Sequence, residues 1–322
     1  MDLTKNELLR TYRVMKTIRE FEERVHVEFA AGEIPGFVHL YAGEEASAAG
    51  ICGHLTDEDS IASTHRGHGH CIAKGVDVNR MMAEIFGRTT GLCRGKGGSM
   101  HIADLDMGMM GANGIVGGGP PLVCGAALAA QRAGKGNVAV AFVGDGGSNQ
   151  GTTFESMNLA KIWNLPAIFV VEDNGYAEAT SSSYSIGAES NAKRAEGFGL
   201  PAVRVDGHDF FAVYTAAGEA IERARNGGGP SFIDCQLNRY YGHFEGDAQT
   251  YRGPNETKIL RDEQDCLLLF AERVTRDTDV TQADLQAIDQ DVATLIEDSV
   301  TAAKAAPKPD RAELLTDVYV SY

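Results

Sequence analysis

Two polar residues that suit a metal ion follow two apolar runs of the sequence. Asp145 lies just past Val138–Val143, in the segment Gly-Asp-Gly, and Asn174 lies just past Ala167–Glu172. If these runs are neighbouring strands, the carboxylate and the amide carbonyl can meet one cation. Mg²⁺ prefers one or two carboxylates together with phosphate oxygens and water. The pair predicts a magnesium–phosphate site, whereas each half alone is also explained by an ordinary Gly-rich or Asn-Gly turn.

Glycine is nearly twice as abundant as its usual share of ~7%, with 38 residues in 322. The glycines gather in Gly91–Gly98, Gly108–Gly119 and Gly144–Gly151. Glycine lets the backbone approach a ligand closely, and a helix N-terminus offers free N–H groups to an anion. The spacing of Thr152 and Glu155 is that of a capping box and predicts a helix start after the third cluster.

Two common phosphate-binding motifs are not met. The stretch from Gly91 to Lys96 is one residue short of a P-loop, and Gly97 stands where that motif needs Ser or Thr. The segment from Gly144 reaches Asn149 where the dinucleotide fingerprint has its third glycine. Ordinary ATP and NAD sites therefore lose their main support.

Three histidines surround an arginine in a short segment. His65, His68 and His70 could form a metal cluster, because imidazole is the commonest metal ligand. Arg66 stands among them, and a fixed cation opposes the binding of a second one. Arginine beside glycine and histidine fits an anion pocket better. We expect an anion site here and a structural role for His70.

Short β-branched runs alternate with helical patterns along the middle of the chain. The predicted strands are Ser60–Thr64, Val138–Val143, Ala167–Glu172, Ala202–Val205 and Ser231–Leu237. The predicted helices among them are Glu44–Leu55, Val78–Phe86, Leu122–Ala133, Thr153–Trp163 and Phe211–Arg225. Near-continuous apolar strands separated by helices indicate an α/β fold, a three-layer parallel sheet with helices on both faces.

Helices also flank this α/β pattern. Apolar residues at three-to-four spacing predict an N-terminal helix over about residues 3–31, and charged helices are expected over 256–275 and 281–305. Without an internal repeat or clear linker, we expect one domain over 1–322, with a C-terminal helical region over about 256–305. Ligands of such sheets bind at the carboxyl ends of the strands, where the glycine clusters are expected.

Composition excludes several classes of protein. Apolar residues make up 43% and charged residues 23%, which excludes wholesale disorder. A net charge of −16 disfavours nucleic acid and anionic membranes as partners. The charged N-terminal segment does not resemble a signal peptide, and no transmembrane stretch stands out. Six scattered cysteines without a CxxC pair fit a reducing compartment, so a cytoplasmic location is expected.

The same residues carry a resemblance. GDGGSNQG followed by EDNGY resembles the thiamine diphosphate motif, GDG with NN about thirty residues later, and Gly144 to Asn174 spans 31 residues. Asp173 departs from the pattern at the first Asn. HRGHG, GLCRGKGGSMH, GANGIVGGGPPL and RYYGHFEGDAQTYR resemble, in order, the α subunit of the thiamine-dependent first component of 2-oxo acid and acetoin dehydrogenase complexes. The resemblance covers nearly the whole chain.

The resemblance implies site roles for particular residues. Asp145, Asn174 and the main-chain carbonyl of Tyr176 would bind Mg²⁺. The side chains of His65 and Arg66 and the backbone N–H groups of Gly146 and Gly147 would hold the diphosphate. Backbone atoms of Gly114 and Val116 would hold the aminopyrimidine. His243 would lie by the diphosphate and the reacting centre, and His68 would assist proton transfer or stabilise the active loop.

The resemblance also implies an activity and partners. Phe244 follows His243 where pyruvate-type relatives usually have Ser, and this segment is most similar to acetoin dehydrogenase α subunits. There, the ylid of thiamine diphosphate attacks acetoin, the C–C bond breaks to release acetaldehyde, and the remaining two-carbon unit passes as acetyl to a lipoyl group of a partner acyltransferase. Pyruvate is the second substrate considered and branched-chain 2-oxo acids the third.

The length of the chain bears on its assembly. Fused family members need about six hundred residues for both cofactor domains, so a separate β subunit is expected to supply the activating glutamate in a heterotetramer of two α and two β chains. A non-catalytic cofactor-binding or assembly subunit, or half of a split transketolase-like enzyme, stays open as an alternative. A transketolase-like half would need extra basic residues for a sugar phosphate, which the acidic chain offers sparingly.

Overall fold

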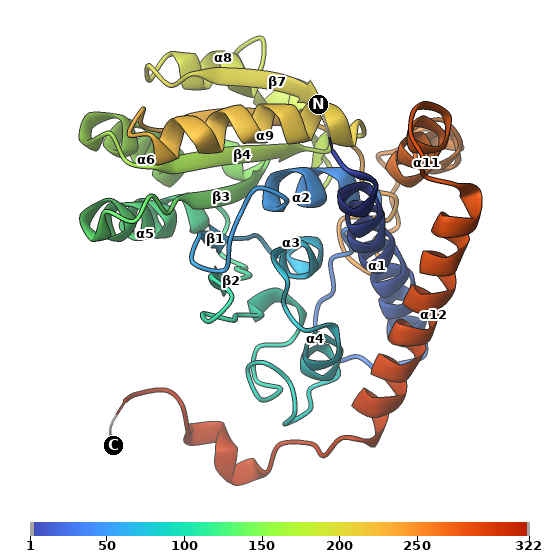
Figure 1. The fold of residues 1–322 in the computed structure, drawn as a ribbon. Helices are drawn as coiled ribbons and strands as arrows, with labels where there is room; N and C mark the ends of the chain where they lie inside the picture. Colours follow the sequence, from blue (N-terminus) through green and yellow to red (C-terminus); the bar gives the residue numbers. More distant parts are fainter. Residues whose placement is uncertain (1–2, 321–322) are drawn as a thin grey trace.

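A computed structural model describes residues 3–320, so the outermost ends of the expected domain lie outside the described residues. Its centre is a sheet of six parallel strands in the order β2-β1-β3-β4-β8-β7 (Figure 1). The strands are β1 Ser60–Ala62, β2 Met109–Gly111, β3 Ala139–Gly144, β4 Ala167–Asp173, β7 Ala202–Asp206 and β8 Ser231–Gln236. A separate two-stranded antiparallel piece pairs β5 Tyr176–Ala177 with β6 Thr180–Ser181. The predicted α/β fold with a parallel sheet is confirmed.

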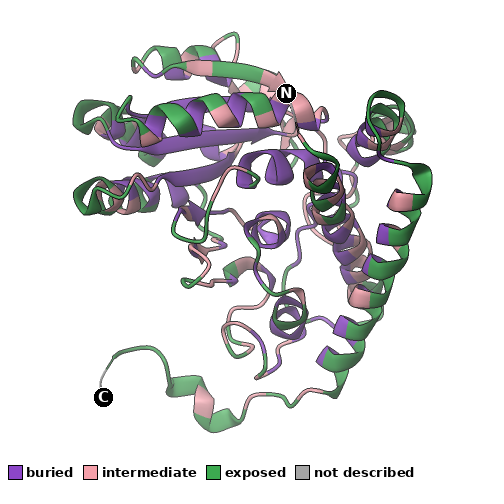
Figure 2. Cartoon of the chain, in the orientation of Figure 1, coloured by how far each residue is buried: buried purple, intermediate pink, exposed green. Residues whose placement is uncertain are grey.

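Alternate residues of the central strands face two different cores. On β3, Val140 and Phe142 pack with α2 Glu45–Cys52 and α9 Phe210–Arg225. Ala141 and Val143 point the other way. There they pack with helices that cover the second face, namely α5 Gly119–Ala133, α6 Gly151–Trp163 and α8 Asn191–Glu196. Figure 2 shows the central strands buried between these layers, which is why their sequences are almost uniformly apolar.

The remaining helices are α1 Lys5–Ala30, α3 His68–Lys74, α4 Val78–Ile85, α7 Ser182–Ser185, α10 Glu256–Glu263, α11 Cys266–Asp277 and α12 Gln282–Ala305. Of these, α1, α3 and α11 pack against α2, while α4 packs against α12. Helix α12 runs beside α1 (Figure 1). The N-terminal helix begins with a capping box of Thr4 and Glu7. No helix within residues 3–320 is both long and apolar enough to cross a membrane.

Two details of the predicted elements are wrong. The single helix expected over 256–275 is broken in two, because Asp265 caps α11 by accepting the N–H of Leu267 while it also binds Arg19. The expected capping role of Thr152 is absent: α6 begins at Gly151, and the Thr152 hydroxyl donates instead to the carbonyl of Gly117 at 2.8 Å. Tertiary partners decide both positions. The short elements β2 and α3 are not anticipated by the sequence.

The first glycine cluster is built around a buried carboxylate. Glu84 is 0% exposed, and its two oxygens accept four backbone N–H groups, from Cys93, Gly95, Gly97 and Gly98, at 2.8 to 3.1 Å. A Cβ on Gly91 would lie 2.4 Å from a Glu84 oxygen. These glycines are therefore needed for a tight loop around Glu84. The expectation that this cluster lies against a ligand at the strand ends is wrong.

We predict that Glu84→Gln lowers the free energy of unfolding by about 2–4 kcal/mol, because the amide nitrogen of Gln would face N–H donors and leave some of them unpaired in the interior. Urea unfolding followed by circular dichroism measures this change. Glu155→Gln, on the exposed face of α6, is the matched control and should change stability by less than about 0.5 kcal/mol. Equal stability of the two variants would contradict the role of Glu84.

Candidate active site

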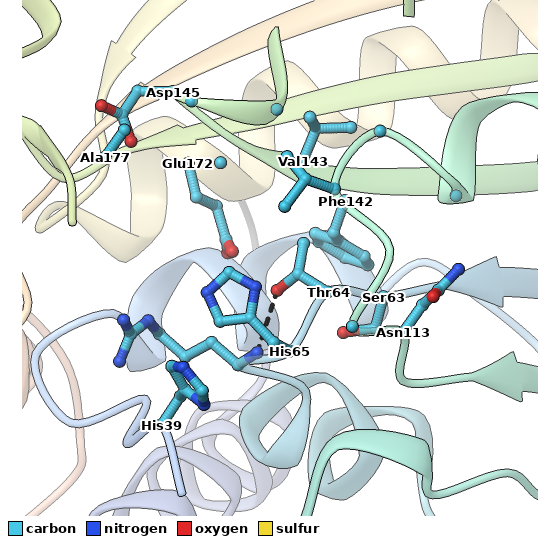
Figure 3. Close-up of a pocket in the computed structure, with 18 of the residues that line it drawn as sticks. His39, Ser63, Thr64, His65, Asn113, Phe142, Val143, Asp145, Glu172 and Ala177 are labelled. Atoms are coloured by element: carbon cyan, nitrogen blue, oxygen red, sulfur yellow. Dashed lines mark hydrogen bonds between the residues drawn. The ribbon is translucent and has the colours of Figure 1, made fainter. Parts of the chain in front are cut away.

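A cavity of about 350 Å³ opens at the carboxyl ends of the strands. Its walls come from the segments after β1, β2, β3, β4 and β8, together with the segment before α2 and Met100 before β2. Figure 3 shows side chains from these segments pointing into one space. Because parallel strands end at the same edge of a sheet, residues far apart in the sequence meet here.

The cavity gathers most of the residues singled out from the sequence. Those that line it are His65, Arg66, Gly114, Val116, Asp145, Gly146, Gly147, Asn174, Tyr176 and His243. His68 does not line it. Its ring is fully buried, with Nδ1 3.0 Å from both carboxylate oxygens of Glu22 on α1 and Nε2 2.9 Å from the hydroxyl of Ser99.

Asp145 is a buried carboxylate with an unused oxygen. The residue is 3% exposed, and its Oδ2 has no hydrogen-bond partner within residues 3–320. Burial and the neighbouring Asp173 raise the pKa of Asp145 to about 7. A carboxylate left in this state is costly unless something compensates it. An oxygen-rich divalent-cation site fits this orphaned atom.

Close packing requires the two glycines after Asp145. A Cβ on Gly146 would lie 2.6 Å from the Cβ of Ala177, and one on Gly147 would lie 2.7 Å from Cγ1 of Val143. The turn then enters a short 3-10 segment before α6. Both backbones border the cavity, and the N–H of Gly146 also faces the carboxylate of Asp145.

Asn174 and Tyr176 form the next wall. The side-chain Nδ2 of Asn174 donates to a carboxylate oxygen of Glu44 at 3.0 Å. The buried guanidinium of Arg239 donates from Nη1 to the carbonyl of Tyr176 at 3.2 Å, and Asn174 Oδ1 lies 3.4 Å from the same nitrogen. The strands that precede Asp145 and Asn174 are neighbours, β3 and β4, as the metal-site prediction requires.

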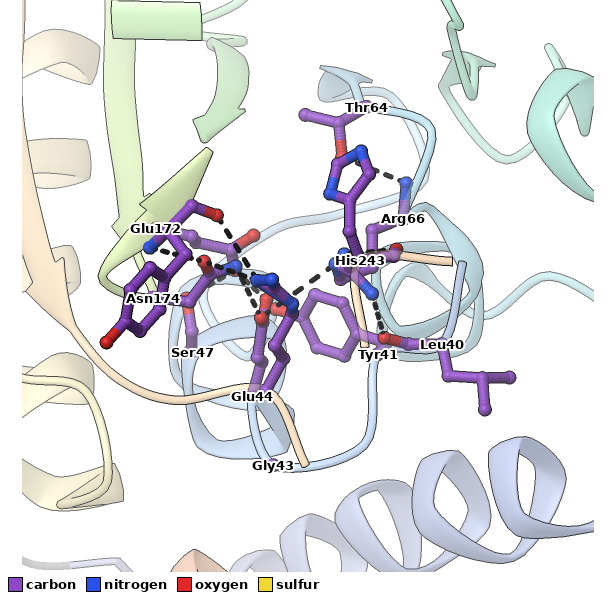
Figure 4. A network of polar contacts seen from close by, with 12 residues as sticks. Leu40, Tyr41, Gly43, Glu44, Ser47, Thr64, Arg66, Glu172, Asn174 and His243 are labelled. Atoms are coloured by element: carbon purple, nitrogen blue, oxygen red, sulfur yellow. Dashed lines mark hydrogen bonds and ion pairs between the residues drawn. The ribbon is translucent and has the colours of Figure 1, made fainter. Parts of the chain in front are cut away.

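Arg66 supplies positive charge at the floor of the cavity. It is 4% exposed and donates to the backbone carbonyls of Leu40 and His243, the latter at 3.0 Å. Its Nε lies 3.9 Å from a carboxylate oxygen of Glu44. Figure 4 shows Arg66, Glu44 and Asn174 joined in one polar network. A guanidinium held in this way is suited to an anion.

Three imidazoles stand together beside Arg66. The rings of His39, His65 and His243 have centroids 4.5 to 5.1 Å apart, and one nitrogen from each lies within 4.8 Å of the others. Burial, with neighbouring imidazoles and Arg66, lowers their pKa values to about 2, 3 and 4 respectively. Neutral imidazoles can donate N–H groups to an anion whose charge Arg66 balances. The adjacent guanidinium opposes a metal ion at this cluster.

The three histidines considered as a metal cluster, His65, His68 and His70, do not lie together, and only His65 belongs to the group beside Arg66. His70 makes contacts elsewhere, with Nδ1 2.7 Å from the hydroxyl of Ser63 and Nε2 3.1 Å from a carboxylate oxygen of Glu172. Its ring also stacks on Phe142, at 3.7 Å between centroids. These contacts agree with the structural role expected for His70.

A hydrogen-bonded chain links the segment of His243 to the wall formed by Tyr176. Asp247 accepts the backbone N–H of His243 at 2.7 Å and the hydroxyl of Tyr251 at 2.5 Å. The same hydroxyl accepts a bond of 2.6 Å from Arg239. The guanidinium of Arg239 thus connects the two walls.

Comparison with known proteins identifies the family of this chain. The dehydrogenase E1 component family matches residues 13–312. The chain belongs to the dehydrogenase E1 component family. The α subunit of acetoin:2,6-dichlorophenolindophenol oxidoreductase of Cupriavidus necator is 63% identical over 322 residues, covering all of this chain and 97% of the relative.

Two further relatives extend the comparison. The subunit of the same name from Bacillus subtilis is 58% identical over the whole chain and 96% of the relative. The α subunit of the pyruvate dehydrogenase E1 component of Rhizobium meliloti is 39% identical over 98% of this chain and 91% of the relative. The sequence-based resemblance to this family is confirmed.

Three side chains at the site of this E1 chain are not predicted from the sequence. His39 lines the cavity, yet it lies in an apolar run, FVHLYA, away from any recognisable spacing. Glu44 and Glu172 also border it. A lone polar residue within an apolar run is the only signal that could have indicated His39.

We predict that the stability of the cofactor-free chain falls as the pH drops below about 6.5, the usual pKa of an exposed histidine. The pKa of folded His39 is lower, so the unfolded state binds more protons below pH 6.5 and acid favours unfolding. In His39→Gln, the loss of unfolding free energy between pH 7.5 and pH 5 should be smaller by about 2 kcal/mol. Urea unfolding at the two pH values measures it, and identical losses in both proteins would contradict the assignment.

Proposed function

We propose that this chain is the α subunit of a thiamine diphosphate-dependent acetoin dehydrogenase. One observation carries the proposal: the unused Asp145 carboxylate oxygen, the Asn174 amide and the buried Arg66 border one cavity, in a chain 63% identical to the Cupriavidus necator subunit. This combination suits a diphosphate that is bound through a divalent cation.

The chain's residues would divide the cofactor among them. Asp145, the carbonyl oxygen of Asn174 and the main-chain carbonyl of Tyr176 would hold magnesium. Arg66, His65, His243 and the N–H groups of Gly146 and Gly147 would hold the diphosphate, with His39 beside them. Backbone atoms of Gly114 and Val116 would hold the aminopyrimidine. When bound, thiamine diphosphate supplies a carbanion-stabilising centre.

His68 fits one of its two expected roles better. Its contacts with Glu22 and Ser99 are buried, and Ser99 precedes Met100, which lines the cavity. His68 would therefore stabilise the loop that bears Met100, and proton transfer near the substrate would fall to His243. The imidazole of His243 is neutral at pH 7, because burial, Arg66 and Arg239 lower its pKa to about 4. A bound diphosphate beside it would raise that pKa and with it the basicity of the ring.

Acetoin fits the cavity better than a 2-oxo acid does. Arg66 is the one Lys or Arg side chain among the lining residues of the described chain, and it is assigned to the diphosphate. A pyruvate carboxylate would need a further cation, whereas acetoin is neutral. We propose cleavage of acetoin to acetaldehyde and transfer of the other two-carbon unit to a lipoyl group of a partner acyltransferase. The lipoyl disulfide would accept the two electrons, so that one of its sulfurs carries the acetyl group and the other becomes a thiol.

A β subunit completes the proposed enzyme. The two acetoin-related proteins are both named as α subunits, and we propose a heterotetramer of two α and two β chains. The six free cysteines, five of them buried, support the expected reducing, cytoplasmic setting.

Substrate preference tests the function directly. We expect the complex of this chain with its β subunit to reduce dichlorophenolindophenol with acetoin, with kcat/KM at least about 100-fold higher than with pyruvate or a branched-chain 2-oxo acid. The chain alone should be inactive. Preference for pyruvate would overturn the acetoin assignment, and cofactor binding without any turnover by the complex would favour a non-catalytic binding subunit.

Cation binding should depend on pH through Asp145. The pKa of this carboxyl is about 7. Below pH 7 a cation must displace the proton of Asp145, whereas above pH 7 the carboxylate is already ionised. The magnesium concentration that half-saturates thiamine diphosphate binding should rise up to about tenfold per pH unit below 7 and level off above. Calorimetry in two buffers of different ionisation enthalpy measures the released proton.

Asp145→Ala serves as the comparison for this titration. Its weaker binding should lose the pH dependence near 7, because the titrating ligand is gone. Equal affinity of this variant and the wild type would refute the metal assignment.

A further inference from the structure

Glu44 lies beneath the cavity between two groups assigned to different parts of the cofactor. It is 1% exposed and borders the cavity. One of its oxygens, Oε1, accepts the Nδ2–H of Asn174 at 3.0 Å and lies 3.9 Å from Nε of Arg66. Figure 4 shows this carboxylate between the two side chains.

The side chain of Glu44 is not needed by its own helix. Glu44 occupies the N-cap position of α2, yet its side chain makes no capping hydrogen bond. Nor is it paired like the nearby Glu172, whose carboxylate accepts bonds from Tyr41, Ser47 and His70. A buried carboxylate needs compensation. For Glu44 it comes from Arg66, Asn174 and Arg239, against the nearby carboxylate of Glu172.

The amide of Asn174 has opposite neighbours on its two sides. Its nitrogen faces the Glu44 carboxylate, and its oxygen faces the guanidinium of Arg239 at 3.4 Å. Turning the amide over would set two donors against each other at Arg239. Amide orientation is assigned from such a network, and this network has one consistent solution. The backbone N–H of Tyr176 also donates to this oxygen, at 3.5 Å, so both of its neighbours are donors.

We propose that Glu44 is a positioning residue that fixes the orientation of the Asn174 amide, so that its carbonyl oxygen, not its nitrogen, is presented to the divalent cation beside Asp145. This inference rests on the proposed function. The guanidinium of Arg66, 3.9 Å from Oε1, favours the charged form of this carboxyl against burial, which raises the pKa of Glu44 to about 8. Glu44 thereby holds Asn174, which is assigned to the cation, close to Arg66, which is assigned to the diphosphate.

Two substitutions separate the acceptor from the charge of Glu44. Glu44→Leu removes the acceptor, whereas Glu44→Gln can still accept the Asn174 hydrogen bond through its carbonyl oxygen. We expect Glu44→Leu to weaken Mn²⁺ binding to the αβ complex with thiamine diphosphate at least about tenfold, as removal of groups that orient metal ligands does. Glu44→Gln should stay within about threefold of wild type. Electron paramagnetic resonance of free Mn²⁺ gives the affinities, and Glu155→Gln is the control for loss of a charge.

Each outcome is decisive. Wild-type affinity in Glu44→Leu would overturn the proposal, and an equal loss in both Glu44 variants would show that charge rather than amide orientation matters. If the wild-type complex binds no Mn²⁺ with thiamine diphosphate, the proposed function fails instead.

A metal-free rescue tests the hydrogen bond itself, even if Glu44→Leu does not fold. Asn174→Asp sets two carboxylates against each other and should lower the melting temperature of the full chain by several degrees. Adding Glu44→Gln reverses donor and acceptor and should restore most of that loss. The effects should be strongly non-additive, as expected for residues in contact. Additive effects of the two substitutions would overturn the proposed contact.

Discussion

A guanidinium buried at the bottom of a cavity constrains much of this structure. Arg66 is almost fully enclosed, and a cation without partners in such a place is prohibitively costly. Its partners come from three parts of the chain: the carbonyl of Leu40, the carboxylate of Glu44 and the carbonyl of His243. The segment before α2, the turn after β1 and the segment after β8 are therefore held together by one charge. The contacts that position Arg66 for an anion are thus the same contacts that hold these three segments together.

The electrostatics of the cavity are divided between two sides. Around Arg66, three imidazoles are kept neutral, so they add donors without adding charge. Around Asp145, burial and the neighbouring carboxylate of Asp173 raise the pKa of the Asp145 carboxyl. A bound cation would compensate the negative charge around Asp145, and a bound anion would compensate the positive charge of Arg66. A ligand that carries both, such as a metal–diphosphate, satisfies the whole cavity at once, whereas either ion alone leaves one side uncompensated.

The sequence is sufficient for the central sheet and for residues that follow strands directly. β3, β4 and β8 are buried on both faces, so their apolar runs are unambiguous, and Asp145 and Asn174 follow from them. Residues whose positions depend on partners distant in the sequence are harder to predict. His39 joins the cavity because α2 packs against the sheet, and Glu84 explains a glycine cluster through hydrogen bonds that no local spacing reveals. The break at Asp265 has the same origin, since Arg19 is its partner.

The order of strands in the sheet has a consequence for synthesis of the chain. β8 lies between β4 and β7, although it is the last of the six strands to be made. Until it emerges from the ribosome, β7 has no neighbour and the long edge of β4 is open, a template for pairing with other chains. His243 follows later still, so the cavity lacks one of its lining residues while the first two-thirds of the chain folds. A cofactor can stabilise the finished subunit by mass action, whereas the nascent chain offers it an incomplete site.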